Sequence, residues 1–237
     1  MNQTDFVLLV KHPAAGRVKR RLAAGTGECH ATGLYRAFVA DILSTFAGAR
    51  LVPTICYYPR YAGADIRRWL GDRYLYLGQR GRDHPGRLRS AFEDMFARGS
   101  GRVIIVGSDN PDLPGGIFGQ ASAALGNNEA VLGPTLDGGY YLLGFRREAF
   151  VPEAFSGIDW STGRVFGQTS ARIRSAGRSL AVLPCWSDID TIDDLRALAS
   201  RGAASAFHGS LTMEYLRRNP EVLNRDCKST GRRGKGA

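Results

Sequence analysis

Residues 6–22 read Phe-Val-Leu-Leu-Val-Lys-His-Pro-Ala-Ala-Gly-Arg-Val-Lys-Arg-Arg-Leu, an apolar run followed directly by a basic loop. The apolar run predicts a buried strand, and the spacing of Val18 and Leu22 predicts that a helix follows with one face toward the core. In α/β proteins, the loop between such a strand and its helix is a common site for phosphate groups. Five cations and no acid stand between Lys11 and Arg21, so the sequence predicts a polyphosphate site here.

A solvated basic helix turn is the alternative interpretation of this charge run. The predicted helix favours a phosphate site over this alternative, because it leaves Lys19, Arg20 and Arg21 around the carboxyl end of the strand. The loop contains one glycine, Gly16, and matches neither the P-loop nor the dinucleotide-binding glycine pattern. Side chains must therefore share the binding of the anion with backbone amides.

The composition predicts one sizeable core, because the chain has 237 residues and is 43% hydrophobic. We expect a single domain over residues 1–219, followed by a basic, disordered tail over 220–237 that is poor in apolar residues. The net charge of +10 is concentrated in residues 11–21 and 216–237. The rest of the chain is close to neutral, which argues against a nucleic-acid-binding protein.

The cysteines are widely separated and form no C-x-x-C pair, which argues against a zinc site or a disulfide framework and favours a cytoplasmic location. The apolar run near the N-terminus is too short for a signal peptide, and no segment approaches the ~20 apolar residues of a membrane span. The histidines lack metal-ligand spacing, so each is expected at the surface or hydrogen-bonded: His12, His30, His84 and His208.

Short β-branched or aromatic runs alternate with helical patterns along the chain. Strands are predicted near residues 6–10, 51–58, 74–77, 103–107, 129–133, 140–145 and 180–184. Helices are predicted over 28–47, 83–98, 190–200 and 203–218. This alternation predicts a three-layer α/β/α sandwich with a mostly parallel sheet covered on both faces.

Acidic residues follow several of these strands. Asp109 comes just after the run 103–107, at the tip of a central strand, and is the first candidate metal ligand. The alternative is that Asp109 or Asp112 only caps the helix that starts near Pro114. Asp190 stands at a second strand-to-helix junction, and two acids from different loops are enough for Mg²⁺, which also takes phosphate oxygens and water.

The order of several motifs resembles one known family. The pattern K-x-P-x-x-G-x-x-K-x-R-L at 11–22 is followed by the segment 79–88, G-x-D-x-P-D-L-P at 107–114, G-P-x-x-D-G-G-Y-Y-L at 133–142, W-S-T at 160–162 and D-x-D-T at 188–191. Together they resemble the rSAM/selenodomain-associated transferase 1 family, a DUF2064-type family. It is similar in fold to nucleotide-diphospho-sugar transferases of the glycosyltransferase-A type.

The resemblance implies a role for each matching residue. Asp109 and Asp190 would hold Mg²⁺ or Mn²⁺. A nucleotide and its phosphates would be bound by Lys11, Pro13, Gly16, Lys19, Arg21, Gln79 and Arg87. The acceptor would be bound by Gly138, Gly139, Tyr140 and Trp160. The chain departs from the usual family pattern at Arg20, at Asn110 and over residues 84–87.

The implied activity is that of a metal-dependent transferase acting on a nucleotide and a small acceptor. Lys19 and Arg21 would neutralise the leaving group, and Asp137 would orient or deprotonate the acceptor, with the following glycines giving it room. Glycosyl transfer from a nucleotide sugar is the label that the family carries. Nucleotidyl transfer from a triphosphate to a phosphorylated acceptor is favoured by the basic loop, and a non-catalytic nucleotide-binding protein is the third hypothesis.

Overall fold

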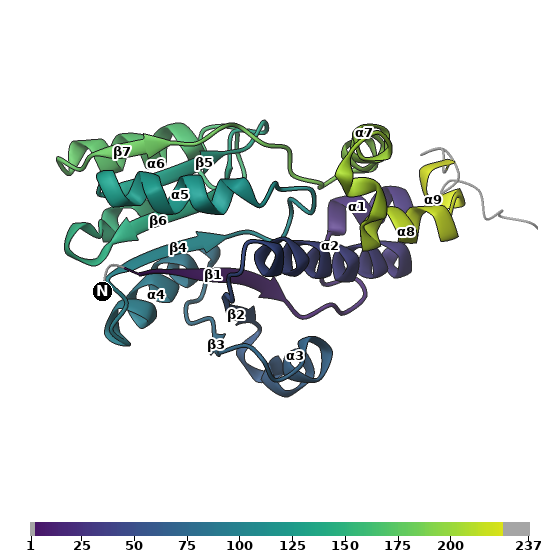
Figure 1. The fold of residues 1–237 in the computed structure, drawn as a ribbon, viewed down its shortest axis with the longest axis horizontal. Coiled ribbons are helices and arrows are strands. Elements are labelled where there is room, and N and C mark those ends of the chain that lie inside the picture. Colours follow the sequence, from purple (N-terminus) through teal and green to yellow (C-terminus); the bar gives the residue numbers. More distant parts are fainter. Residues whose placement is uncertain (1–2, 225–237) are drawn as a thin grey trace, which may run out of the picture.

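The computed structural model describes residues 3–224, and its centre is a seven-stranded sheet in the order β3-β2-β1-β4-β6-β5-β7 (Figure 1). The strands are β1 Thr4–Lys11, β2 Thr54–Tyr58, β3 Tyr76–Gly78, β4 Arg102–Val106, β5 Ala130–Pro134, β6 Tyr140–Arg146 and β7 Leu180–Val182. Strand β6 runs antiparallel to its neighbours β4 and β5, and the other neighbouring pairs are parallel. The predicted, mostly parallel sheet is confirmed.

Helices cover both faces of the sheet. Successive residues of β1 are apolar and point to opposite faces, so both faces need a covering layer. Phe6, Leu8 and Val10 belong to one buried cluster, whereas Val7 belongs to another on the opposite face. The first face is covered by α2 Glu28–Gly48, α3 Gly63–Leu70 and α5 Gly116–Asn127, and the second by α4 His84–Ala97 and α6 Val165–Ser175 (Figure 1). The three-layer architecture is confirmed.

A third buried cluster lies among helices at one end of the molecule, to the right of the sheet in Figure 1. Its helices are α1 Arg20–Thr26, α7 Ile192–Ala203, α8 Leu211–Arg218 and α9 Glu221–Asn224, which pack with α2. Leu22 of α1 and Leu195 of α7 are both fully buried there. This packing holds the start of α1 close to the start of α7, and both starts carry predicted site residues.

The helix predicted over 203–218 is interrupted. A 3-10 turn, Ala206–Gly209, precedes α8, and Ser210 caps α8 through its side chain. The buried carboxylate of Asp41 also accepts hydrogen bonds from the first two backbone N–H groups of α8, at 2.8 and 2.9 Å. The side chains of Ser210 and Asp41 thus satisfy the first backbone N–H groups of α8. A new helix is therefore able to begin at Leu211, and the predicted helix is interrupted before it.

The ordered chain continues beyond residue 219. Val222 in α9 is fully buried in the third cluster, and the carbonyl of Leu223 accepts a hydrogen bond from Arg196 at 3.0 Å. Residues 220–224 therefore pack against the domain, so its boundary lies later than expected. The rest of the expected tail, residues 225–237, lies outside the described residues.

A chain that ends at Asn219 is expected to be less stable than one that ends at Asn224. Loss of the fully buried Val222 removes apolar burial that contributes about 1.5–3 kcal/mol to the free energy of unfolding. Urea unfolding of the two truncated chains measures the difference. Equal unfolding midpoints would contradict the packing described for α9.

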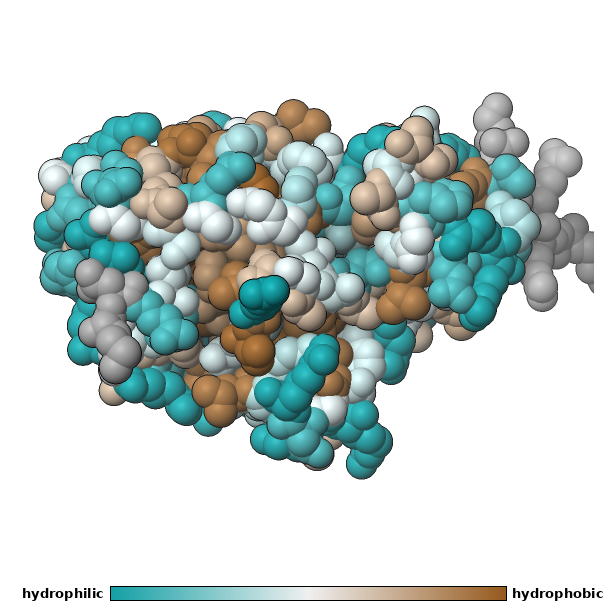
Figure 2. Space-filling model, in the orientation of Figure 1, coloured by the Kyte–Doolittle hydropathy of each residue, from teal (hydrophilic) through white to brown (hydrophobic). Residues whose placement is uncertain are grey.

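The surface in the orientation of Figure 2 is mixed, with hydrophilic residues along the periphery and apolar residues between them over the middle of this face. No helix among residues 3–224 is both long and apolar enough to cross a membrane.

Candidate functional site

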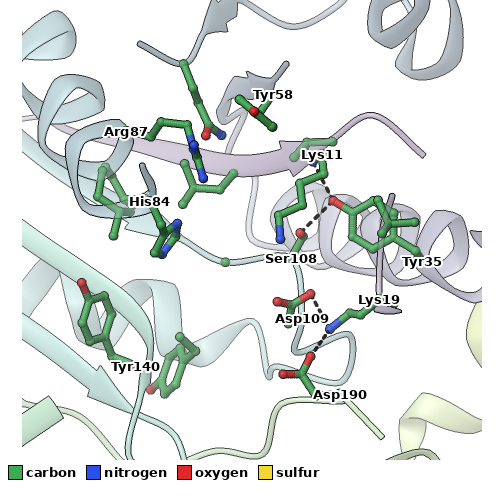
Figure 3. Close-up of a pocket in the computed structure, with 18 of the residues that line it drawn as sticks. Lys11, Lys19, Tyr35, Tyr58, His84, Arg87, Ser108, Asp109, Tyr140 and Asp190 are labelled. Carbon is green, nitrogen blue, oxygen red and sulfur yellow. Dashed lines mark hydrogen bonds and ion pairs between the residues drawn. The ribbon is translucent and has the colours of Figure 1, made fainter. Parts of the chain in front are cut away.

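A cavity of about 570 Å³ opens at the carboxyl ends of β1 and β4 (Figure 3). Its walls also include the starts of α1 and α4, part of β6 and the segment before α7. Eight of the predicted site residues line it: Lys11, Lys19, Arg21, Gln79, Arg87, Asp109, Tyr140 and Asp190. The fold thus gathers residues that are far apart in the sequence at the edge where parallel sheets bind ligands.

Lys19 links the two predicted metal acids. Its ammonium lies 2.5 Å from Asp109 Oδ1 and 2.9 Å from Asp190 Oδ1, and only 4% of its side chain is exposed. Desolvation lowers the pKa of Lys19, but the two carboxylates outweigh it and raise the pKa above its ordinary value. Lys19 therefore stays charged between the two acids. Its backbone has a left-handed conformation, with φ 47°, just before α1.

Asp109 is held by the loop that follows β4. Its carbonyl accepts a hydrogen bond from Ile189 N at 2.9 Å, and the side chain of Asn110 donates to Ser187 O at 2.8 Å. These bonds join the two loops that carry Asp109 and Asp190. Burial raises the pKa of Asp109, but Lys19 and Lys11 outweigh this and lower it, so the carboxyl is ionised.

Neither Asp109 nor Asp112 caps a helix. The N-cap of α5 is Gly115, which forms no side-chain capping bond. Asp112 instead accepts hydrogen bonds from Trp186 Nε1 at 3.1 Å and Arg201 Nε at 2.7 Å. The capping interpretation of the two aspartates is wrong, because a longer connection between β4 and α5 takes Asp112 to the loop and helix that support Asp190.

Asp190 owes its position to the start of α7. Thr191 is the N-cap of this helix and forms a capping box with Asp194, which leaves the carboxylate of Asp190 outside the capping network. The Asp190 carboxylate meets Lys19 and, at 3.4 Å, Arg21. The predicted helix start is confirmed, and its cap fixes the direction in which Asp190 projects.

Two aromatic residues, Tyr35 and Tyr58, contact the predicted site residues Lys11 and Arg87. The backbone N–H of Lys11 donates to the hydroxyl of Tyr35 at 2.7 Å, and that hydroxyl lies 3.1 Å from Ser108 Oγ. Arg87 stacks over the ring of Tyr58 at 4.3 Å. Tyr35, Ser108 and Tyr58 all line the cavity. Sequence reasoning missed them because Tyr35 and Tyr58 lie outside the motifs and Ser108 fills a variable position of the motif at 107–114.

Gln79 is almost fully buried and lines the cavity directly after β3. Its side-chain amide donates to Cys56 O at 2.8 Å. A buried amide held by the sheet leaves its carbonyl oxygen able to accept a hydrogen bond from a ligand. The side chain therefore offers a hydrogen-bond acceptor at the wall of the cavity.

The donor set fits a shared cation. Asp109 and Asp190 converge on one ammonium, which shows that their carboxylates face a common point. No cluster of three or more His, Cys, Asp or Glu residues able to hold a metal occurs among residues 3–224. Two carboxylates suit Mg²⁺ or Mn²⁺ when a nucleotide's phosphates and water supply the other ligands.

The remaining predicted residues do not line this cavity. Pro13 lies in a smaller hollow beside Trp69, and Gly16 packs against Glu28. Trp160 lies in a shallow groove next to the cavity, where its ring meets those of His84 and Tyr140.

Asp137 and its glycines build a turn rather than an open space. Asp137 accepts hydrogen bonds from Thr135 Oγ1 at 2.6 Å and Gly139 N at 2.9 Å. A Cβ atom on Gly138 would lie 2.2 Å from the carbonyl oxygen of Gly163, so the missing side chain admits the backbone of a neighbouring loop. At Gly138, protein backbone occupies the room that was expected for a ligand, and a Cβ atom on Gly139 would meet the side chains of Thr135 and Asp137.

Gly138→Ala is expected to destabilise the protein more than Gly177→Ala does. Both glycines have positive φ, +87° and +73°, which costs an alanine about 1–2 kcal/mol. No atom lies within 4 Å of a Cβ on Gly177, whereas Gly138 adds the clash with Gly163. Thermal unfolding of both variants measures the difference, and equal losses would contradict this account of the turn.

His84 is exposed, as the sequence predicted, but it also borders the cavity. It is the first residue of α4, it lines the cavity, and its ring nitrogens have no hydrogen-bond partner within residues 3–224. Sequence reasoning placed it among surface or hydrogen-bonded histidines because no spacing marked it. Only the packing of α4 against the sheet places it beside the predicted site.

Comparisons with known proteins agree with this fold. A family model described as an uncharacterized protein conserved in bacteria, DUF2064, matches residues 42–162. No curated protein matches the chain. Among solved structures, a "putative nucleotide-diphospho-sugar transferase" from Desulfovibrio desulfuricans is 36% identical, covers 94% of this chain and 98% of its own, and has a TM-score of 0.89.

More distant structures share the fold alone. A 4-diphosphocytidyl-2C-methyl-D-erythritol synthase is 12% identical, with a TM-score of 0.54 over 83% of this chain and 97% of its own. Rv0371C of Mycobacterium tuberculosis, in complex with manganese, is 18% identical, with a TM-score of 0.51 over 83% of this chain and 97% of its own. The family resemblance predicted from the motifs is confirmed: the chain belongs to the DUF2064 family and has the fold of nucleotide-diphospho-sugar transferases.

Proposed function

We propose that this protein is a metal-dependent transferase that moves a glycosyl group from a nucleotide sugar to a small acceptor. The observation that carries the proposal is the single cavity in which Lys19 holds Asp109 and Asp190 together beside the other cations of the basic loop. The relative that is 36% identical and described as a "putative nucleotide-diphospho-sugar transferase" supports the choice of donor.

The residues of the cavity have two roles in this proposal, phosphate binding and metal binding. Lys11, Lys19 and Arg21 bind the phosphates and neutralise the charge that grows on the departing diphosphate. Asp109 and Asp190 would hold Mg²⁺ or Mn²⁺, which supplies further positive charge to the phosphate oxygens. An ammonium has three donors, so Lys19 is able to keep contact with one carboxylate while it donates to a phosphate.

Nucleotidyl transfer from a triphosphate is the second candidate. Arg17 and Arg20 line the cavity, are exposed, and have no ion-pair partner among residues 3–224. Two cations beyond those paired with acids suit a pyrophosphate leaving group, whose negative charge is at least as large as that of a nucleoside diphosphate. This observation favours a triphosphate as donor, whereas the similar structure favours a nucleotide sugar.

Product analysis separates the candidates. The protein is incubated with Mg²⁺ or Mn²⁺, a panel of nucleotide sugars, a panel of triphosphates and mixed acceptors. Acceptor-dependent release of nucleoside diphosphate supports glycosyl transfer, and acceptor-dependent release of pyrophosphate supports nucleotidyl transfer instead. Tight nucleotide binding with neither product would identify a non-catalytic binding protein.

A further inference from the structure

His84 stands at one end of the cavity with its ring unengaged. The ring packs edge-on against Trp160, with centroids 5.3 Å apart, and no hydrogen bond joins it to any residue in 3–224. Figure 3 shows His84 across the cavity from Lys19 and its two partners, Asp109 and Asp190. An imidazole that lines a cavity and has no partner of its own is available to accept a hydrogen bond from a ligand.

Tyr140 supplies a second, independent observation at this end. Its hydroxyl oxygen is buried and has no hydrogen-bond partner among the described residues, and its ring also packs against Trp160, at 6.3 Å. Buried hydroxyl groups are normally hydrogen-bonded, so an unpaired one beside a cavity points to a ligand that completes the bond. His84 and Tyr140 thus mark a polar subsite with an aromatic wall.

The two ends of the cavity differ in character. Lys19, Arg20 and Arg21 make one end strongly cationic and suited to phosphates. At the other end, Leu88 lies one helical turn after His84 and also lines the cavity, next to the aromatic rings. Lys11 and Arg87 also act on His84, so this end combines an apolar wall and two neutral polar groups with two nearby cations.

The surroundings of His84 keep its imidazole neutral. Desolvation within the cavity, together with Lys11 and Arg87, lowers its pKa to about 4, although Asp109 and Asp83 act in the opposite direction. The N-terminus of α4 adds a further positive potential at this position. At neutral pH the ring is therefore uncharged, and one of its nitrogens has a lone pair that is able to accept a hydrogen bond from a ligand.

The other predicted base is engaged elsewhere. Asp137 closes a turn outside the cavity, and Asp109 and Asp190 are both paired with Lys19. We propose that His84 is the general base that removes the proton from a hydroxyl group of the acceptor, and that the acceptor is an alcohol, such as a sugar hydroxyl, rather than a phosphate monoester. This inference rests on the transfer reaction proposed above.

The atoms of such a step balance. The acceptor oxygen forms a bond to the anomeric carbon of the donor sugar as the bond from that carbon to the nucleotide diphosphate breaks. The electron pair of the broken bond leaves with the diphosphate, and the hydroxyl proton moves to the imidazole, which later releases it to water. A phosphate monoester is largely deprotonated at neutral pH and would need no such base.

The test compares His84→Asn with the same substitution at His208, which is exposed in a short turn before α8. With hydroxylated acceptors, His84→Asn is expected to reduce kcat by about 100-fold or more, whereas the calorimetric Kd for the metal–nucleotide complex stays unchanged. Added imidazole should partly restore turnover in His84→Ala, which leaves space for it. His208→Asn should match the parent protein in every assay.

Three results would overturn the role of His84. They are full turnover by His84→Asn, products formed only from phosphate monoesters, and no product from either class of acceptor. In the last case nucleotide binding still stands as evidence for the donor site. Failure of the parent protein to bind any nucleotide would instead overturn the proposed function itself.

Discussion

Asp109→Asn is expected to lower the affinity for a metal–nucleotide complex by at least about 100-fold, since loss of even an outer partner of a metal ligand costs 10–100-fold. The amide keeps the shape of the side chain but removes the charge that Lys19 and the metal share. In the free protein, Lys19 keeps its contact with Asp190 at 2.9 Å, so the fold should survive. Calorimetry with Mg²⁺ or Mn²⁺ and a nucleotide measures the loss.

Asp72→Asn is the matched control for this prediction. Like Asp109, Asp72 pairs with a cation, Arg67 at 3.0 Å, but its side chain is 84% exposed at the surface beyond α3. The control should bind the nucleotide as the parent protein does. Unchanged affinity in both Asp109→Asn and Asp190→Asn would rule out a metal site shared by the two acids.

Lys19→Met is expected to reduce turnover by about 100- to 1,000-fold, the range found when one donor to a developing negative charge is removed. Methionine fills a similar volume without an ammonium, so the leaving diphosphate loses a buried cation. The loss should appear mainly in kcat, because the charge on the leaving group grows in the transition state. Steady-state kinetics of the purified variant tests this.

Arg50→Met controls for the effect of placing methionine in the left-handed backbone conformation that Lys19 adopts. Arg50, like Lys19, is a non-glycine residue with positive φ, 57° against 47°, but it is exposed after α2. Any general cost of placing methionine in that conformation should therefore appear in both variants. If Arg50→Met lost as much activity as Lys19→Met, backbone strain and not the ammonium would explain the effect.

Much of the fold follows from short patterns. The apolar run at residues 6–10 forms β1, an inner strand of the sheet, and the stripe of apolar residues over 28–47 forms the long helix α2. The continuous apolar run reports burial on both faces of a strand, and the helical stripe reports burial on one face of a helix. Both patterns depend on local periodicity alone. The interruption before α8 was not foreseen, because it depends on Asp41, which lies 170 residues earlier in the chain.

The candidate site was only partly predictable. Motifs named the loop cations, Asp109 and Asp190, which the fold brings to one cavity. They also named Asp137 and the following glycines, whose roles in a turn depend on the backbone of Gly163. Nothing in the sequence near His84 reports that Trp160, 76 residues later, will lie beside it.

The sequence by itself determined the class of fold, the family and the cationic character of the first loop, because periodicity, motif order and charge are local properties. The tertiary structure decided which charged groups meet. It placed Lys19 between two acids from distant loops, and it placed His84 and Tyr140 around Trp160. Such contacts depend on how helices and loops pack across the sheet, and no local pattern in the chain encodes those distances.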